Sequence, residues 1–360
     1  MGISGLTKFL RDECPQVFHE INIRDLQYQK GAVDISLYVF KYITIFGDRW
    51  LTAILNLVST LRKHNIHCCF IYDTSAPQEK MAERESRREK RDKLDDRITA
   101  LQDALVVAHT SGRIEQILLD LHEKLKAGED KTKIKRLLRR EEVVRTQPVD
   151  LDELEREVDR ISKQSVHVQE SDFLNSKALF QLLGVPFFNA AVEAETTCSD
   201  LCKQGKVDFV LSEDSDVLAY GAPMFVSRIN TSSGTATVVY YEEVLSALEF
   251  TSDQFLDFCI MCGTDYNSNI RLIGPKKAFR LIREHGSIEA IAETGIDVSA
   301  LNHTRGRELF LGYEKFTGKI PYCGQPDFQK LGEFLFRHNI GVSLDTVRKN
   351  FTEPDIVFEE

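Results

Sequence analysis

The stretch Val207-Asp208-Phe209-Val210-Leu211-Ser212-Glu213-Asp214-Ser215-Asp216 decides the fold, because an apolar run ends there in two carboxylates two residues apart. Short runs of β-branched and aromatic residues bounded by polar residues are typical of buried strands in a parallel sheet. In extended or turn backbone, residues i and i+2 point the same way, so Asp214 and Asp216 are expected to face one point. We therefore predict a strand whose carboxyl end carries an acidic site.

The same pattern recurs at three further apolar runs. Gly31-Ala32-Val33 precedes Asp34, Cys68-Cys69-Phe70-Ile71-Tyr72 precedes Asp73, and Val185-Pro186-Phe187-Phe188 is followed by Glu193 and Glu195. A single Asp after a strand is ordinarily a turn former or a helix N-cap. Because ligand sites of open α/β sheets lie at the carboxyl ends of the strands, the repetition favours a shared site instead. Asp265, which follows a helical stretch, is expected at the same edge.

These carboxylates together indicate a metal site. Clustered like charges raise one another's pKa and need cations to stay ionised. An all-oxygen ligand set selects Mg²⁺ or Mn²⁺ over zinc. Cys259-x-x-Cys262 is half of a zinc motif, but no second pair at matching spacing accompanies it. We therefore predict a magnesium site at this edge of the sheet.

Composition describes an ordinary globular chain of 360 residues, with 42% hydrophobic and 28% charged residues. No apolar run approaches the roughly 18 residues of a membrane span, so we expect no membrane association. The eight cysteines read as buried reduced thiols in a reducing, intracellular compartment. The net charge of −10 is unfavourable for a nucleic-acid enzyme. Basic residues nevertheless gather at 124–145, and the run 131–140 is either a nuclear address or a phosphate-facing helix.

Periodicity divides the chain into four parts. Residues 1–76 and 169–250 alternate helix and strand, and we expect them to form two halves of one α/β core, with a mostly parallel central sheet flanked by helices. Residues 77–168 are charged and poor in strands, with helices expected at about 78–108, 113–126, 131–146 and 151–163 and a turn at 127–130. Residues 251–360 are expected to be mainly helical. The segment 77–168 is therefore predicted to be a helical insertion.

An ordered series of motifs resembles the flap endonuclease and XPG-type structure-specific 5′ nucleases from residue 1 to about 290. It comprises Met1-Gly2-Ile3-Ser4-Gly5-Leu6, Val33-Asp34-Ile35-Ser36, Ile71-Tyr72-Asp73, Glu193-Ala194-Glu195 and Ser212-Glu213-Asp214-Ser215-Asp216. Gly263-Thr264-Asp265-Tyr266 with Ile270–Ala278 resembles the metal Asp and the helix–two-turn–helix of that family. The resemblance implies a PIN-like core, with an arch and cap at 77–168 that admit a single-stranded 5′ arm.

The resemblance also implies roles for individual residues. Two magnesium ions, roughly 4 Å apart, would activate water and stabilise a departing oxygen. Their ligands, direct or through water, would be Asp34, Asp73, Glu193, Glu195, Asp214, Asp216 and Asp265. Lys80 and Arg87, at i and i+7 on one helix face, match the catalytic Lys and Arg that stabilise charge on the scissile phosphate. The alternative for this pair is two surface charges on a charged helix.

DNA contacts follow in the same way. Gly2 would lie near the active site, and Phe40, or else Tyr38, would stack on a base, with core packing as the alternative. Gly274, Lys276 and Lys277 would begin a helix whose amides face duplex phosphate. Potassium would be held by the backbone carbonyls of Asn269, Ile270 and Leu272, although Leu272 stands where the family usually has Gly.

Departures from the family narrow the expected substrate. The segment between Asp34 and Asp73 is short, which implies a reduced DNA wedge and 3′-flap pocket, whereas the helical insertion is long. No Gln-x-x-Leu-x-x-Phe-Phe motif is present, so we expect a monomer without a sliding-clamp partner. The prediction is a magnesium-dependent 5′ nuclease that cleaves 5′ flaps, at the nucleus or another site of DNA replication (the cytoplasm if viral). The alternatives are a 5′→3′ exonuclease, a Holliday-junction or bubble endonuclease, an RNA-degrading relative and a non-catalytic scaffold.

Overall fold

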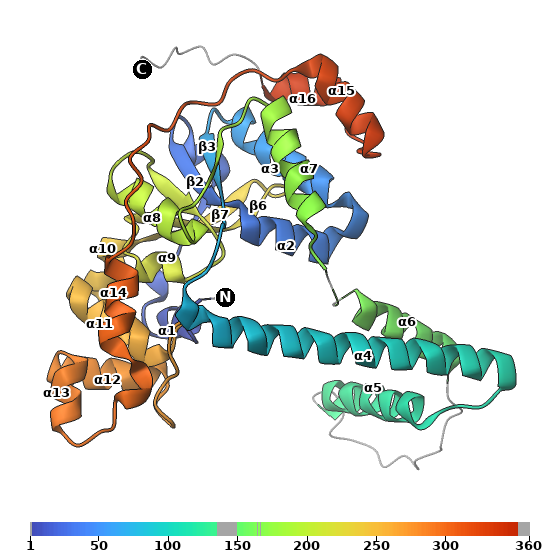
Figure 1. The fold of residues 1–360 in the computed structure, drawn as a ribbon, viewed down its shortest axis with the longest axis horizontal. Helices are drawn as coiled ribbons and strands as arrows, with labels where there is room; N and C mark the ends of the chain where they lie inside the picture. Colours follow the sequence, from blue (N-terminus) through green and yellow to red (C-terminus); the bar gives the residue numbers. More distant parts are fainter. Residues whose placement is uncertain (1, 135–149, 164, 166, 352–360) are drawn as a thin grey trace. The chain divides into compact units, whose positions relative to one another are not determined.

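The structure is a computed structural model that describes residues 2–134, 150–163, 165 and 167–351. Within these residues the chain forms two compact units (Figure 1). Unit 1 comprises Met1–Glu83 and Val168–Glu360, and unit 2 comprises Arg84–His167. The helix α4, Met81–Ser111, begins in the first unit and continues into the second. Each unit has its own hydrophobic core.

Unit 1 is built on a seven-stranded sheet with the strand order β1-β7-β6-β5-β2-β3-β4. The pairs β6–β5, β5–β2, β2–β3 and β3–β4 are parallel, and β7 is antiparallel to both β6 and β1. The predicted α/β class with a mostly parallel sheet is confirmed. The strands are β1 His19–Asn22, β2 Lys30–Asp34, β3 His67–Tyr72, β4 Phe187–Asn189, β5 Phe209–Leu211, β6 Met224–Asn230 and β7 Thr235–Tyr240.

Both faces of this sheet are covered by helices, which is why its central strands are apolar without alternation. Along β3, Cys69 and Ile71 belong to one core cluster, while Phe70 and Tyr72 belong to the other. The first face packs against α1 Leu6–Glu13, α8 Ala194–Lys203, α9 Asp216–Ala219, α10 Tyr241–Leu248 and α11 Ser252–Cys262. The second packs against α2 Ile35–Phe46, α3 Trp50–Lys63, α7 Glu170–Leu182, α15 Phe328–Arg337 and α16 Leu344–Asn350.

The sheet centre is packed so closely that a glycine is required on β2. A Cβ placed on Gly31 would clash with the ring of Phe209 on the neighbouring strand β5. The ring of Phe209 is completely buried in this position. A residue as small as Ala at position 31 would therefore displace an aromatic core side chain.

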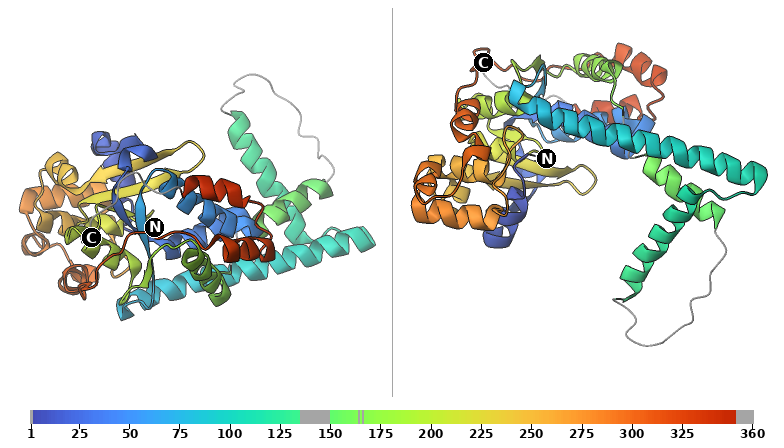
Figure 2. Two further views of the ribbon diagram at one scale, coloured as in Figure 1. Left: turned by 90° about the horizontal axis from the view of Figure 1, so that it is seen from above. Right: turned by 60° about the horizontal axis from the view of Figure 1, so that its bottom comes forward.

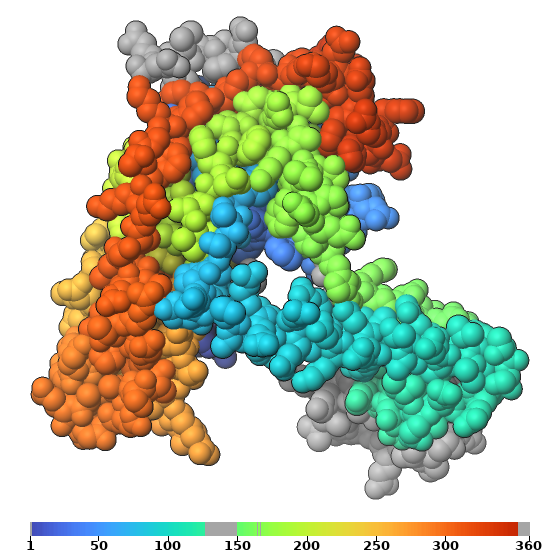
Figure 3. Space-filling model, viewed as in Figure 1, coloured from blue at the N-terminus to red at the C-terminus, as the bar shows by residue number. Residues whose placement is uncertain are grey.

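The remaining helices of unit 1 follow the sheet in sequence (Figure 2). They are α12 Pro275–His285, α13 Ile288–Glu293 and α14 His303–Leu311. An extended segment, residues 312–327, then leads from α14 to α15 along the surface of the unit (Figure 3). Its Cys323 backbone N–H donates a hydrogen bond of 3.1 Å to His67 Nδ1 at the start of β3, which ties this segment to the sheet.

Unit 2 is helical, consisting of most of α4, of α5 Gln116–Ile134 and of α6 Leu151–Ser162. Its core is formed by apolar side chains of all three helices, among them Leu101, Leu118 and Leu154. The predicted turn at 127–130 is wrong, because α5 continues through it. A lone Gly in a helix costs only about 1 kcal/mol relative to Ala, and neighbouring helix formers offset that cost. The predicted helix at 131–146 falls mostly outside the described residues.

None of the helices that the structure describes is both long and apolar enough to cross a membrane.

Candidate active site

Four neighbouring strands, β4-β3-β2-β5, carry acidic residues at or after their carboxyl ends. Asp34 is the last residue of β2, and Asp73 directly follows the parallel strand β3. Glu193 and Glu195 begin α8 after β4, and Asp214 and Asp216 follow β5. Parallel strands bring their carboxyl ends to one edge of a sheet, which is where the sequence pattern placed these six side chains.

Hydrogen bonds hold the carboxylates of adjacent strands in place. Asp34 caps α2 by accepting from the Leu37 N–H at 3.3 Å, and it also accepts from the Ser212 hydroxyl at 3.2 Å. Asp73 accepts from the Ala194 N–H at 2.7 Å. These bonds link β2 to the loop after β5, and β3 to the start of α8. Asp34 therefore has the structural role of an N-cap, which is ordinary for an Asp that follows a strand.

Lys80 lies among the carboxylates as their counter-ion. Its ammonium group is 2.6 Å from Glu193 Oε1, 3.1 Å from Asp265 Oδ2 and 3.5 Å from Glu195 Oε1, and its side chain is only 13% exposed. Burial disfavours the charged form, but the surrounding carboxylates outweigh burial and raise the pKa of Lys80 above its ordinary value. The ammonium group therefore stays charged and joins Asp265 of the α11–α12 loop to the strand-end cluster.

Two tyrosines that sequence reasoning missed complete the inner side of the cluster. The Tyr266 hydroxyl donates to Glu193 Oε2 at 2.5 Å, and it lies 2.8 Å from the Tyr220 hydroxyl. Burial raises the pKa of both phenols, so both remain neutral donors. Their positions in the sequence could have indicated that they lie near the cluster, because Tyr266 follows Asp265 directly and Tyr220 lies one helical turn after Asp216.

Negative charge in the cluster is not fully compensated. Burial and then neighbouring carboxylates raise the pKa of Asp34 and Asp216, and burial raises the pKa of Glu195 and Asp214. Asp216 is completely buried, and among the described residues neither of its carboxylate oxygens has a hydrogen-bond partner. An unpaired buried carboxylate is costly unless a cation or a proton neutralises it.

The cluster suits a hard divalent cation in donor type and charge, but it is not a preformed coordination shell. Within the part of the chain that the structure describes, no three acidic, His or Cys side chains surround one point at ligand distance. Glu193, Glu195 and Asp265 face the Lys80 ammonium instead. Convergence of all the carboxylates on one point, as expected from sequence, is therefore not seen, because like charges repel and Lys80 is their countercharge. The oxygens of Asp216 remain available as ligands.

The other predicted residues lie in different surroundings. Gly2 has a left-handed backbone (φ 85°), and a Cβ there would clash with Asp214, which places this glycine against the cluster. Phe40 is 44% exposed and meets Phe173 edge-on, whereas Tyr38 is fully buried in the core. The structure thus leaves Phe40, and not Tyr38, accessible for stacking. Arg87 belongs to unit 2, in the first turns of α4.

The predicted duplex-binding turn precedes α12. Gly274 is the N-cap of α12, and Lys277 in its first turn is exposed. The Lys276 ammonium pairs with Glu13 of α1 at 3.0 Å. Asn269 is exposed, and the Ile270 carbonyl accepts a hydrogen bond from the backbone of Ile273 at 3.0 Å.

Leu272, which replaces the usual Gly, is 80% exposed and has a φ of 65°. This is the left-handed region that a glycine adopts without strain. The turn therefore keeps a glycine-like backbone although a leucine occupies it.

Comparison with known proteins agrees with this geometry. The family described as XPG N-terminal domain matches residues 1–94, and the XPG I-region matches residues 184–265. The chain is 32% identical to the probable RAD2-like endonuclease 076L of Invertebrate iridescent virus 3, with all of both chains covered. It is 31% identical to flap endonuclease 1-A of Sorghum bicolor, covering 81% of this chain and 69% of that one.

A solved structure shares the fold at low sequence identity. The catalytic core of Rad2 in complex with DNA substrate superposes with a TM-score of 0.65 at 14% identity, over 97% of this chain and 99% of the other. The family matches and the curated relatives define a nuclease that hydrolyses phosphodiester bonds. The chain belongs to the XPG-type flap endonuclease family, whose members depend on divalent metal ions and bind DNA.

Proposed function

We propose that this protein is a magnesium-dependent, structure-specific 5′ nuclease that cleaves DNA at 5′ flaps and related branches during replication or repair. The observation that supports the proposal most is the buried carboxylate cluster at the carboxyl ends of four adjacent strands. Within it, Asp216 carries two oxygens without a hydrogen-bond partner among the described residues. Such oxygens suit Mg²⁺, or Mn²⁺ in its place.

Each residue of the cluster has a proposed task. The metal ligands, direct or through water, are Asp34, Asp73, Glu193, Glu195, Asp214, Asp216 and Asp265. Divalent ions held there would supply Lewis acidity to the attacking water and the leaving oxygen. Lys80 is the countercharge of Glu193, Glu195 and Asp265. With Arg87 it would stabilise charge that develops on the scissile phosphate. Tyr266 orients Glu193 through its hydroxyl group.

DNA recognition would use surfaces on both units. Lys276 and Lys277 at the start of α12 would contact duplex phosphate after Gly274, and the carbonyls of Asn269, Ile270 and Leu272 would hold potassium. Gly2 lets the chain approach Asp214, and Phe40 would stack on a base. The segment 77–168 would act as the arch and cap that admit a 5′ strand, between the core halves 1–76 and 169–250 and the duplex-binding region 251–360.

The remaining parts of the proposal concern partners and place. The protein would act as a monomer on branched DNA without a sliding-clamp partner. It would work where DNA is replicated, in the nucleus or, given its similarity to an endonuclease of an iridescent virus, in the cytoplasm.

The test compares cleavage of one end-labelled panel, comprising a 5′ flap, a gap, a four-way junction, a bubble and single-stranded RNA. We expect Mg²⁺-dependent cutting that is strongest on the 5′ flap, is stopped by EDTA and is restored by Mg²⁺ or Mn²⁺. Asp214→Ala should abolish cutting while DNA binding persists, and Asp253→Asn, which changes an exposed acid of α11, serves as the matched control. Cleavage that survives EDTA, or preference for the junction, bubble or RNA, would contradict the proposal.

A further inference from the structure

Unit 1 has a polar cavity of about 250 Å³ that is lined by none of the clustered carboxylates. It is lined by side chains of α1, β1, β6 and β7 and of the segment between α1 and β1. Two arginines from distant parts of the sequence line it, Arg11 on α1 and Arg228 on β6. Glu20 is the single acidic residue in its lining.

Among the residues that the structure describes, the guanidinium groups of Arg11 and Arg228 have no hydrogen-bond or ion-pair partner, Glu20 included. The Nε atom of Arg11 is fully buried without a partner, and its guanidinium lies 4.2 Å from the centre of the Phe18 ring. Burial and then the positive charge of Arg228 lower the pKa of Arg11, so the two cations are close enough to repel each other. Unsatisfied, converging donors of this kind are what an anion binds.

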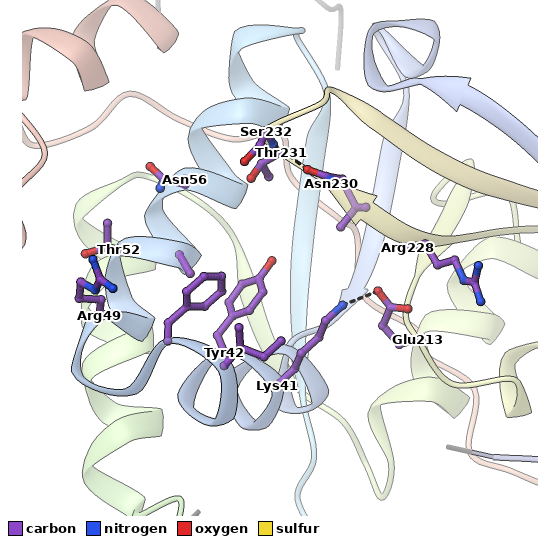
Figure 4. Close-up of a pocket in the computed structure, with 14 residues that line it drawn as sticks. Lys41, Tyr42, Arg49, Thr52, Asn56, Glu213, Arg228, Asn230, Thr231 and Ser232 are labelled. Atoms are coloured by element: carbon purple, nitrogen blue, oxygen red, sulfur yellow. Dashed lines mark hydrogen bonds and ion pairs between the residues drawn. The ribbon is translucent and has the colours of Figure 1, made fainter. Parts of the chain in front are cut away.

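Local backbone geometry places Arg228 in this position. Its φ of 51° is left-handed, a conformation that side-chain-bearing residues rarely adopt. It lies where the pairing of β6 with β7 shifts register, between Ser227 and Asn230. In Figure 4 the Arg228 guanidinium lies on the side of Glu213 that faces away from Lys41. Arg228 borders two cavities, the groove that Tyr42 and Asn56 line and the polar cavity that it shares with Arg11.

We propose that Arg11 and Arg228 bind one backbone phosphate of the duplex part of the DNA substrate; this assignment rests on the proposed function. Two guanidinium groups match the oxygens of a phosphate, because each presents planar, paired N–H donors. The Asn230 amide at the same wall supplies a further donor. The strand β6 pairs with β5, whose end carries Asp214 and Asp216, so a phosphate held there would fix duplex against the sheet that bears the reactive cluster.

The test measures binding of a fluorescein-labelled 5′-flap DNA in EDTA, over a series of KCl concentrations. Arg228→Gln and Arg11→Gln should each weaken binding about five- to tenfold and flatten the slope of log Kd against log [KCl] by about 1. The double variant should lose little more than either single one, because both side chains hold the same phosphate. Arg24→Gln, which changes an exposed arginine near His64, is the matched control and should leave Kd and slope unchanged. Because Arg228 is exposed, its variant tests the site even if the Arg11 variant fails to fold.

A second arm separates a DNA phosphate from a free one. Inorganic phosphate should raise the Tm of the wild type more than that of either variant. If phosphate does so but the salt slope for DNA is unchanged in both variants, the site takes a free anion and the DNA assignment is overturned. If neither measurement changes, the site itself is refuted. All binding is measured without metal, so a wild type that binds through these arginines but fails to cut flaps with Mg²⁺ would refute the proposed function and leave the phosphate site standing.

Discussion

Replacing Tyr266 by Phe should loosen the carboxylate cluster without disturbing the surrounding core. The Tyr266 hydroxyl donates to Glu193 at 2.5 Å and meets the Tyr220 hydroxyl at 2.8 Å. The ring packs against Phe310 with centroids 5.3 Å apart, a contact that phenylalanine retains. The substitution thus removes two hydrogen bonds and nothing else.

The expected cost follows from those two bonds. A hydrogen bond to a charged acceptor contributes about 1.5–3 kcal/mol, and one between neutral groups contributes about 1 kcal/mol. Glu193 is buried and keeps only Lys80 as a described partner for its carboxylate. We therefore expect Tyr266→Phe to lower the free energy of unfolding by about 2–4 kcal/mol. Cleavage should slow as well, because Glu193 loses the donor that orients it.

Urea unfolding followed by near-ultraviolet circular dichroism measures the first effect, and single-turnover cleavage measures the second. Tyr240→Phe, at an exposed residue whose hydroxyl makes no hydrogen bond with the described residues, is the control. A double-mutant cycle with Glu193→Gln should return a coupling energy of about 1–3 kcal/mol. A Tyr266→Phe protein within about 0.5 kcal/mol of the wild type would refute the reasoning, since that is the ordinary range for surface substitutions.

Three further outcomes follow from charges described above. Asp216→Asn should raise the Tm of the metal-free protein, because it removes a carboxylate whose pKa is raised by burial. It should also abolish cleavage. A lower Tm than that of the wild type in EDTA would contradict the first expectation. Glu13→Gln should free the Lys276 ammonium from its ion pair. Because such surface pairs are worth about 0–1 kcal/mol, duplex binding at low salt should tighten by up to about fivefold. Unchanged affinity in a fluorescence-anisotropy titration would count against Lys276 as a phosphate contact. Hydrogen bonds from Arg307 lower the pKa of Glu289 from 4.5 to about 2. Their contribution to the free energy of unfolding is therefore complete above about pH 4.5 and is lost as the pH falls toward 2. In urea titrations, Glu289→Gln should flatten this part of the stability–pH curve.

The sheet could be predicted from sequence because burial on both faces leaves its central strands continuously apolar. The run ending at Asp73 stands out on that basis, and so does the run before Asp214. The short strand β1 carries no such signal, since His19–Asn22 is a half-exposed edge strand of four residues. Helix boundaries depended on turn residues, and Gly128 misled because a single glycine does not end a helix whose neighbours favour it.

Side-chain partners could not be predicted in the same way. The family resemblance indicated that Lys80 is important, but its contacts with three carboxylates depend on how the α11–α12 loop returns to the sheet. The contact between Tyr266 and Glu193 joins residues 73 positions apart, which no local pattern encodes. Arg11 and Arg228 lie still further apart in sequence, and only the folded structure brings them to one cavity. The motifs therefore predicted which residues lie at the strand ends, but not the side-chain contacts between those residues.

The order of the strands in the sheet differs from their order in the sequence, so the ribosome supplies neighbouring strands at different times. The strand β2 lies between β3 and β5, although the residues of β5 are made about 140 positions after those of β3. The carboxylates extend from Asp34 to Asp265, so at about 5–20 residues per second a ribosome needs roughly 10–50 s to supply the full set. An unfinished chain lacks Asp265, and an interrupted translation product that ends before it has an incomplete cluster. Under the proposed function, such a truncated product lacks one of the seven proposed metal ligands.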